Sequence, residues 1–214
     1  MTREELIKRI ALKMDEISSS DEVIVPVDTG DNNPLYTQIN NLLNESVNDV
    51  LMKAPIYRLH DHVDTVSTSI SGETFDKSRR TAIITVPDDF VRLVSISDES
   101  LQRPIIELAI EGDDIDMRQH NKHLVAKNAK PVAVISNGAK RKITCYSYAN
   151  NQTPNPSLLY IKRYDNDRDT YSETGLDGYM TDLVSWVCAG KVFAAQGDIN
   201  KMKICDDNAS SLMI

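Results

Sequence analysis

The sequence lacks the features that define membrane proteins and small cross-linked proteins. No apolar run is long enough to cross a bilayer, which excludes a transmembrane span. The three cysteines, Cys145, Cys188 and Cys205, are widely spaced and form no C-x-x-C pair, so we expect free, buried thiols in a reducing compartment. At 214 residues the chain can bury a core without disulfides or metals.

Motifs of catalysis and phosphate binding are also missing. There is no G-x-S-x-G elbow, no glycine-rich loop after a predicted strand and no H-E-x-x-H spacing. The four histidines, His60, His62, His120 and His123, come without the pattern of a fourth zinc ligand. The sequence therefore predicts no catalytic residue, no metal site and no cofactor.

Positive charge is in deficit, since 24 lysines and arginines stand against 32 aspartates and glutamates, for a formal net charge of −8. Gripping nucleic acid requires clustered positive charge, so sequence-specific DNA binding is not expected, whereas an acidic wall would let DNA pass without sticking. We interpret the one basic and aromatic cluster as a solvated hairpin and leave open a contact with DNA or an acidic partner: Lys127, Lys130, Lys140, Arg141, Lys142, Tyr146 and Tyr148.

Apolar residues at helical spacing mark the first part of the chain. Thr2 and Glu5 form a capping box that predicts a helix from Arg3 to about Ile17. The mixed charges of this stretch indicate no signal peptide. Pro34 suits the first position of a second helix, whose apolar stripe ends at Ala54.

After Pro55 the apolar period changes from 3.6 to 2, which predicts a β domain. The turn Pro87, Asp88, Asp89 and Phe90 joins two of its strands, because proline fixes φ and aspartates bond nearby backbone amides. The expected elements are strands at residues 63–70, 81–86, 90–96 and 158–164, a short apolar segment at 105–108, one or two helical turns within 113–121, and a hairpin formed by 132–135 and 143–148.

Helical spacing returns over residues 176–195, and Gly197 is placed to cap that helix. A further helix is expected from Asp198 to about Cys205. The first six residues of the tail that follows, residues 206–214, hold a helix poorly, so an irregular tail is expected, and it ends in three apolar side chains: Leu212, Met213 and Ile214.

The order of helices, strands and helices predicts an α+β protein. We expect the N- and C-terminal helices to pack as a small bundle with an inserted, mainly antiparallel β domain. Residues 1–55 would form the N-terminal part of the bundle, residues 56–170 the β domain, and residues 171–214 the C-terminal helices with their tail.

Two groups of carboxylates invite a functional interpretation. Asp88 and Asp89 are neighbours in a turn, where side chains usually point apart, so turn chemistry is favoured over an acid–base pair. An acidic surface loop is also favoured over a calcium site at residues 165–173, although cation binding there stays open. That loop has acidic residues at calcium-loop spacing but lacks the required glycine and the final bidentate glutamate: Asp165, Asp167, Asp169, Thr170, Glu173 and Leu176.

The central stretch also carries a resemblance. A strand is followed by Pro87-Asp88-Asp89-Phe90, then by a hydrophobic strand containing Arg92-Leu-Val-Ser, a polar turn and Arg103-Pro104-Ile105. This order resembles the core of tailed-phage head-to-tail adaptor proteins, and is closest in style to the ring proteins of short-tailed and crAss-like phages. Residues 86–94 and 102–106 carry the match, and the flanking helices, with Trp186 in the last helical region, stand where the family has them.

The resemblance implies a structural protein of the virion, located at the head–tail junction and, during assembly, in the host cytoplasm. Its partners would be copies of itself in a dodecameric ring, the portal protein, tail or further ring proteins, and passing genomic DNA. It implies portal docking by the C-terminal segment, which we assign to Leu212, Met213 and Ile214; the alternative is a tail folded back on its own subunit.

Two other functions remain open. The chain could be a cytoplasmic enzyme or ligand-binding module that uses the aspartate-rich loop 165–173. It could also be a different tail or baseplate component with the same β domain.

Overall fold

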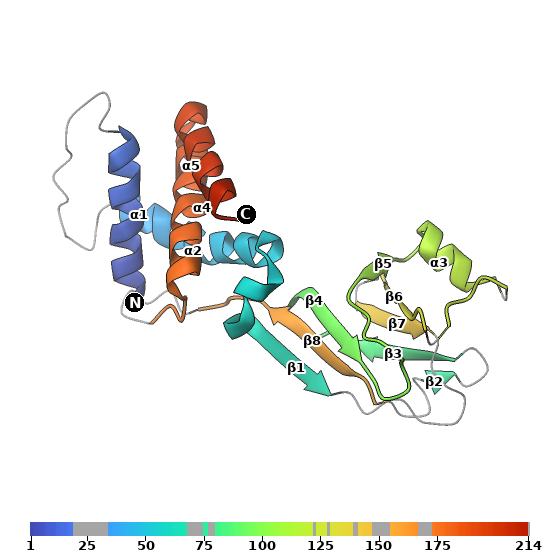
Figure 1. The fold of residues 1–214 in the computed structure, drawn as a ribbon. Coiled ribbons are helices and arrows are strands. Elements are labelled where there is room, and N and C mark those ends of the chain that lie inside the picture. The colour runs from blue at the N-terminus through green and yellow to red at the C-terminus, as the bar shows by residue number, and fades with distance from the viewer. Residues whose placement is uncertain are drawn as a thin grey trace. The chain divides into compact units, whose positions relative to one another are not determined.

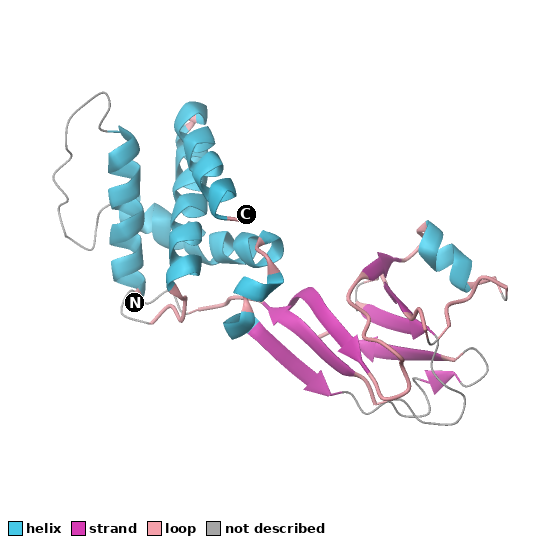
Figure 2. Ribbon diagram, viewed as in Figure 1, coloured by secondary structure: helices cyan, strands magenta, loops and turns pink. Residues whose placement is uncertain are grey.

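The computed structural model describes residues 1–18, 34–67, 75–76, 80–121, 123–127, 129–138, 141–146, 155–166 and 173–213. Helices and antiparallel or mixed sheets make it an α+β protein, as predicted (Figure 2). The chain forms two compact units: a helical unit of Met1–Arg58 and Tyr164–Ile214, and a β unit of Leu59–Arg163. The unit boundaries therefore fall after residues 58 and 163, where the sequence placed them after 55 and 170.

The helical unit is a bundle of four helices from the two ends of the chain (Figure 1). They are α1 (Arg3–Ser18), α2 (Pro34–Lys53), α4 (Gly178–Gln196) and α5 (Ile199–Leu212). Helix α4 contacts each of the other three and buries ten of its 19 residues, so it forms the centre of the bundle. No helix in the part of the chain that the structure describes is both long and apolar enough to cross a membrane.

The sequence signals at the ends of these helices act as predicted. The Thr2 amide donates to Glu5 Oε2 (2.9 Å) and the Glu5 amide to Thr2 Oγ1 (3.3 Å), which is the reciprocal capping box. Gly197 has φ of 80°, a left-handed conformation that glycine adopts without strain, and it caps α4. The Asp198 side chain then accepts from the Lys201 amide and starts α5.

The prediction that the last helix ends near Cys205 and is followed by an irregular tail is wrong. Helix α5 continues to Leu212, because its inner face packs on α4 and tertiary contact outweighs the weak local propensity of residues 206–211. Gly190 of α4 makes this packing close, since a Cβ at that position would lie 3.3 Å from Cys205 Cβ.

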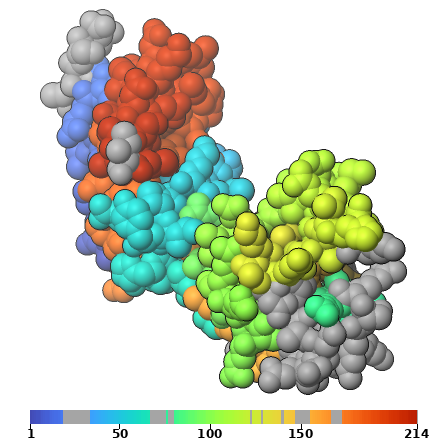
Figure 3. All heavy atoms as spheres, turned by 45° about the vertical axis from the view of Figure 1, so that its right-hand side comes forward, coloured from blue at the N-terminus to red at the C-terminus, as the bar shows by residue number. Residues whose placement is uncertain are grey.

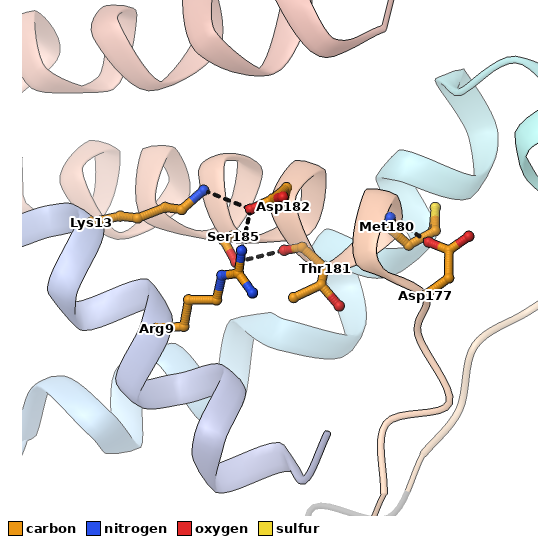
Figure 4. Close-up of polar contacts among 7 residues, drawn as sticks. All are labelled: Arg9, Lys13, Asp177, Met180, Thr181, Asp182 and Ser185. Atoms are coloured by element: carbon orange, nitrogen blue, oxygen red, sulfur yellow. Dashed lines mark hydrogen bonds and ion pairs between the residues drawn. The ribbon is translucent and has the colours of Figure 1, made fainter.

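Polar side chains tie α1 to α4 at the edge of the bundle. Asp182 accepts from Arg9 (2.6 Å) and from Lys13 (3.3 Å), as Figure 4 shows. The Lys13 ammonium also lies 4.3 Å from the centre of the Trp186 ring, a cation–π distance. One carboxylate of α4 therefore holds two cations of α1, and one of them rests on the only tryptophan.

A second set of polar contacts lies inside the bundle, along one face of α2. Arg3 is fully buried and donates to the side-chain oxygens of Asn40 and Asn44 and to the Asn40 carbonyl. One turn further, the Asn48 side chain accepts from the Tyr164 amide (2.8 Å) and donates to its carbonyl (2.9 Å). This asparagine row fixes both the start of α1 and the segment in which the chain re-enters the helical unit.

The β unit contains two sheets. One has the order β1 (Val63–Ser67), β8 (Ser157–Lys162) and β4 (Phe90–Ser97), and it is antiparallel. The other has the order β2, β3, β7, β6, β5, antiparallel except for the β5–β6 pair. Its strands are Phe75–Asp76, Thr81–Thr85, Lys142–Tyr146, Val132–Ile135 and Leu108–Ile110. The predicted β6–β7 hairpin is present, with Ile135 opposite Ile143.

The two sheets of the β unit share one apolar core, so the inward-facing apolar residues of strands in both sheets pack together. Its large members include Ile84, Phe90, Leu93, Ile96, Leu101, Ile105, Ile143, Leu158 and Tyr160. The cysteines are free and buried as expected, and burial raises the pKa of the Cys188 and Cys205 thiols of the helical unit to about 11.

The predicted apolar segment at 105–108 is divided between the sheets. Ile105 exchanges two backbone hydrogen bonds with Ile96 of β4, whereas β5 begins at Leu108 and pairs with β6. After β5 comes the short helix α3 (Asp114–Gln119), within the predicted range. The remaining short helices are 3₁₀ turns at Ile56–Arg58 and His60–His62. Residues 68–70 and 147–148 of two predicted strands lie outside the described residues.

Candidate functional site

The turn Pro87–Phe90, which is part of the motif that resembles the phage adaptors, is held by hydrogen bonds. The Phe90 amide closes the turn on the Pro87 carbonyl (3.1 Å), and the Asp89 carbonyl accepts from the Arg163 amide. The Asp89 carboxylate accepts from the Tyr160 hydroxyl (3.0 Å). Burial, with this hydrogen bond adding to it, raises the pKa of Tyr160 to about 12. The turn is thus fastened to β8 through both its backbone and its side chains.

The Phe90 side chain packs in the core of the β unit and so anchors the turn there. Its ring stacks on that of Tyr160, with the two centroids 5.7 Å apart. The Arg141 guanidinium lies 5.9 Å from the centroid of the Phe90 ring. Asp88, in contrast, is exposed. The two adjacent carboxylates therefore have different surroundings, one bracing the core and one facing water, which suits turn chemistry.

The aspartate-rich loop is only partly described, since Asp167 and Asp169 lie outside the described residues. Asp165 and Glu173 are exposed, and the backbone of Glu173 bridges to Thr2. Asn166 donates to the Glu173 carbonyl (2.8 Å), which closes the loop at its base. Across the described ranges, no three His, Cys, Asp or Glu side chains are close enough to hold a metal ion.

The histidines lie on two separate parts of the β unit. His60 contacts its neighbour Asp61 (3.1 Å), and His120 contacts Asp116 one helical turn earlier (3.5 Å). His62 is buried and His123 is exposed. The contacts of His60 and His120 are thus local to their own short elements.

The structure divides the basic cluster that the sequence groups together. Val132 pairs with Tyr146, so Lys130 lies near one end of the β6–β7 hairpin, whereas Lys142 bonds to Ser136 at the other. At about 3.3 Å per residue, the ends are roughly 13 Å apart. Tyr146 is buried, so it offers no stacking surface. Lys140 and Tyr148 lie outside the described residues.

The C-terminal residues of the docking hypothesis lie at the end of α5. Leu212 is 37% exposed, whereas Met213 is partly buried and lines a groove of about 410 Å³ on its own helical unit. Ile214 lies outside the described residues. The groove lies among α2, α4 and α5, with an apolar lining that includes Val187, Ala194, Met202 and Ala209. As far as Met213, the tail therefore lies against its own subunit.

Sequence reasoning missed an apolar surface around β5 and α3. Five large apolar side chains between residues 106 and 124 are 45–65% exposed: Ile106, Ile110, Ile115, Met117 and Leu124. Helix α3 buries Asp116, which accepts from the Gly112 amide (2.9 Å), and places Ile115 and Met117 outward. Contiguous exposed apolar side chains of this kind often mark a contact surface.

This surface surrounds a pocket of about 340 Å³. We call it the β5–α3 pocket; its walls are Arg103–Ala109, Ile115 and Pro131–Ala133. Atoms of this part of the chain, green to yellow in Figure 3, lie at the surface of the β unit. The pocket is mainly apolar, and two of its walls, Ile106 and Ile115, are themselves exposed.

No model of a known protein family matches this chain. A search of curated proteins finds no significant relative either.

Proposed function

We propose that this chain is a head-to-tail adaptor of a tailed phage. Many copies, twelve in the expected ring, join the portal vertex to the tail and line the route of the DNA. The role is structural and involves no catalysis. The protein acts in the virion and is present in the host cytoplasm while virions assemble.

The observation that supports this proposal most is the turn at residues 87–90 of the β unit, which is held by hydrogen bonds and by packing of Phe90. Pro87, Asp89 and Phe90 of the resemblance motif each take a structural role there, and the β unit that contains them is inserted between helices from both ends of the chain. That architecture is the one the resemblance implies. The exposed apolar surface around β5 and α3 adds support, because it fits a protein that works in an assembly.

The net charge of −8 fits DNA that slides past the subunit. We propose that the channel wall is net acidic and reads no sequence. A continuous basic lining in the assembled ring would contradict this part of the proposal.

We still propose that the end of α5 contacts the portal, but we now assign the contact to Leu212 and no longer to Met213. Met213 lies in the groove of its own subunit, so Leu212 is the described apolar side chain of the tail that is available to a partner. Because Leu212 is 37% exposed, covering it contributes roughly a third of the value for a fully exposed leucine, about 0.5–1 kcal/mol, which is weak for one subunit but adds up in a ring that docks many at once.

The test is co-sedimentation with portal rings, followed by electron microscopy of the complex. We expect the wild-type chain to sediment with the portal as a ring and Leu212→Asp to stay in the supernatant. Ile204→Asp is the matched control, since Ile204 lies on the same helix and is 47% exposed. Wild-type protein that never binds portal rings would overturn the proposed function; equal binding by Leu212→Asp would overturn only the docking residue.

A further inference from the structure

The stretch around the β5–α3 pocket differs in charge from the rest of the chain. Residues 101–130 contain five basic and five acidic side chains, so they are neutral, while the other residues carry the whole net charge of −8. Two copies of a strongly acidic protein repel each other least where the local charge is zero. This neutral region is also the one with the exposed apolar side chains.

The rim of the pocket carries both signs of charge. Arg103 and Glu107 are exposed and line the pocket, and neither forms an ion pair or side-chain hydrogen bond within the described ranges. They flank Pro104, Ile105 and Ile106, which gives a short segment with a cation at one end, an anion at the other and apolar residues between. Two such segments placed antiparallel bring each arginine beside the other copy's glutamate.

The shape of this surface, like its charge, is complementary to the same surface of a second copy. Ile106 is 64% exposed and projects next to a pocket of about 340 Å³ whose walls are mainly apolar. When the same surface of a second copy faces it across a two-fold axis, a projecting side chain on each copy meets a pocket on the other.

Pairing of strand edges does not explain this surface. The Ile105 amide and carbonyl are both bonded to Ile96, and the Ile110 amide and carbonyl are both bonded to Asp113. These bonds occupy backbone groups that an added strand would need. These occupied groups therefore favour a contact made by side chains.

We propose that the Arg103–Glu107 segment packs against the same segment of a second copy of this chain about a two-fold axis. Ile106 of each copy enters the β5–α3 pocket of the other, and Arg103 of each pairs with Glu107 of the other. This inference goes beyond the proposed ring, because a two-fold contact uses the same surface on both copies and closes on itself.

The first test is sedimentation equilibrium of the full chain over a range of concentrations. We expect reversible dimers for the wild type. For Ile106→Asp we expect weaker association, with a Kd raised at least about 30-fold. Leu12→Asp on α1 is the matched control, since Leu12 is 57% exposed but lies in the helical unit, and it should leave the Kd unchanged. An unchanged melting curve shows that each variant is folded.

The second test uses charge reversal. Arg103→Glu and Glu107→Arg should each weaken self-association about tenfold, because each variant places like charges opposite one another. An equimolar mixture of the two should associate as tightly as the wild type, since every pair across the axis is then of opposite sign. The double variant Arg103→Glu/Glu107→Arg should also recover.

A wild-type chain that stays monomeric overturns the proposal, as does equal weakening by Ile106→Asp and Leu12→Asp. A mixture that does not recover overturns the two-fold pairing of Arg103 with Glu107. The proposed function fails separately: a chain that is monomeric yet binds portal rings retains it, whereas a chain that dimerises but never binds them loses it.

Discussion

The two units of this protein are held together in different ways. The helical unit uses polar side chains that reach from one helix to another: Arg3 with the α2 asparagines, Asp182 with two cations of α1, and Lys191 with Glu45 (2.6 Å) and Asp49 (2.7 Å). The β unit relies mainly on backbone ladders and on an apolar core between two sheets. Its described polar side-chain contacts between strands include Tyr160 with Asp89, and the exposed pair of Lys162 with Asp64 (3.7 Å).

Their surfaces differ as well. Among the described residues, the large exposed apolar side chains of the helical unit are distributed over Met1, α1, α2, α5 and the turn after α2, whereas those of the β unit fall between residues 106 and 124. Scattered exposed apolar residues are normal, but a concentrated set indicates a contact surface. In the helical unit, polar contacts between helices fix the helix positions, whereas the β unit has a concentrated exposed apolar surface.

The largest expected effect is at the buried arginine. Arg3→Ala should lower the free energy of unfolding of the helical unit by about 2–5 kcal/mol, because it leaves a cavity and removes the hydrogen bonds that the buried guanidinium donates to Asn40 and Asn44. Trp186, in α4, is the only tryptophan, so its fluorescence during denaturation reports on this unit.

Arg9→Ala is the control for this change, since Arg9 lies on the same helix with 40% of its side chain exposed and should cost under about 1 kcal/mol. Hydrogen exchange of the β-unit amides should be unaffected by either variant. Equal losses for Arg3→Ala and Arg9→Ala would show that burial of Arg3 adds nothing.

A smaller effect is expected at the contact of Tyr160 with Asp89 in the β unit. Tyr160→Phe keeps the ring against Phe90 but removes the donor to Asp89, which should cost about 1 kcal/mol. Hydrogen exchange of the β4 and β8 amides measures it. Protection that is unchanged in the variant would mean that the hydrogen bond contributes no stability.

The same residue predicts a dependence on pH. The pKa of Tyr160 is raised from 10.0 to about 12, so the folded state holds the proton more tightly than the unfolded state. Its contribution to stability is complete below pH 10 and is lost as the pH rises from 10 to 12. In Tyr160→Phe this part of the alkaline loss should disappear; an identical alkaline profile in the variant would contradict the assignment.

Local signals in the sequence predicted most of the fold because each acts on its own neighbours. The Thr2–Glu5 capping box, the Gly197 cap and the strand alternation around Pro87 all lie where they were expected. The end of α5 was not predictable in this way, because contact with α4 across Gly190 outweighs the propensity of residues 206–211.

The surface around β5 and α3 was missed for a related reason. Ile115 and Met117 flank Asp116, a pattern that does not show which side faces inward until the hydrogen bond from Gly112 is known. A signal was nevertheless present in Arg103-Pro104-Ile105-Ile106-Glu107, where opposite charges bracket apolar residues. Grouping Lys130 with Lys142 failed because strand pairing separates residues that are near in sequence.

The smallest expected effect is at the contact of Asp182 with α1. About 40% of the Asp182 and Arg9 side chains is exposed, so water screens the pair, while Lys13 is more covered and also rests on Trp186 (Figure 4). Asp182→Asn should therefore cost only about 0.5–1 kcal/mol, and the difference from the wild type should shrink as salt is added. Denaturation followed by Trp186 fluorescence at low and high salt measures both. A loss close to that of Arg3→Ala, or one independent of salt, would show that the exposed contact of Asp182 stabilises the helical unit as much as the buried contacts of Arg3 do.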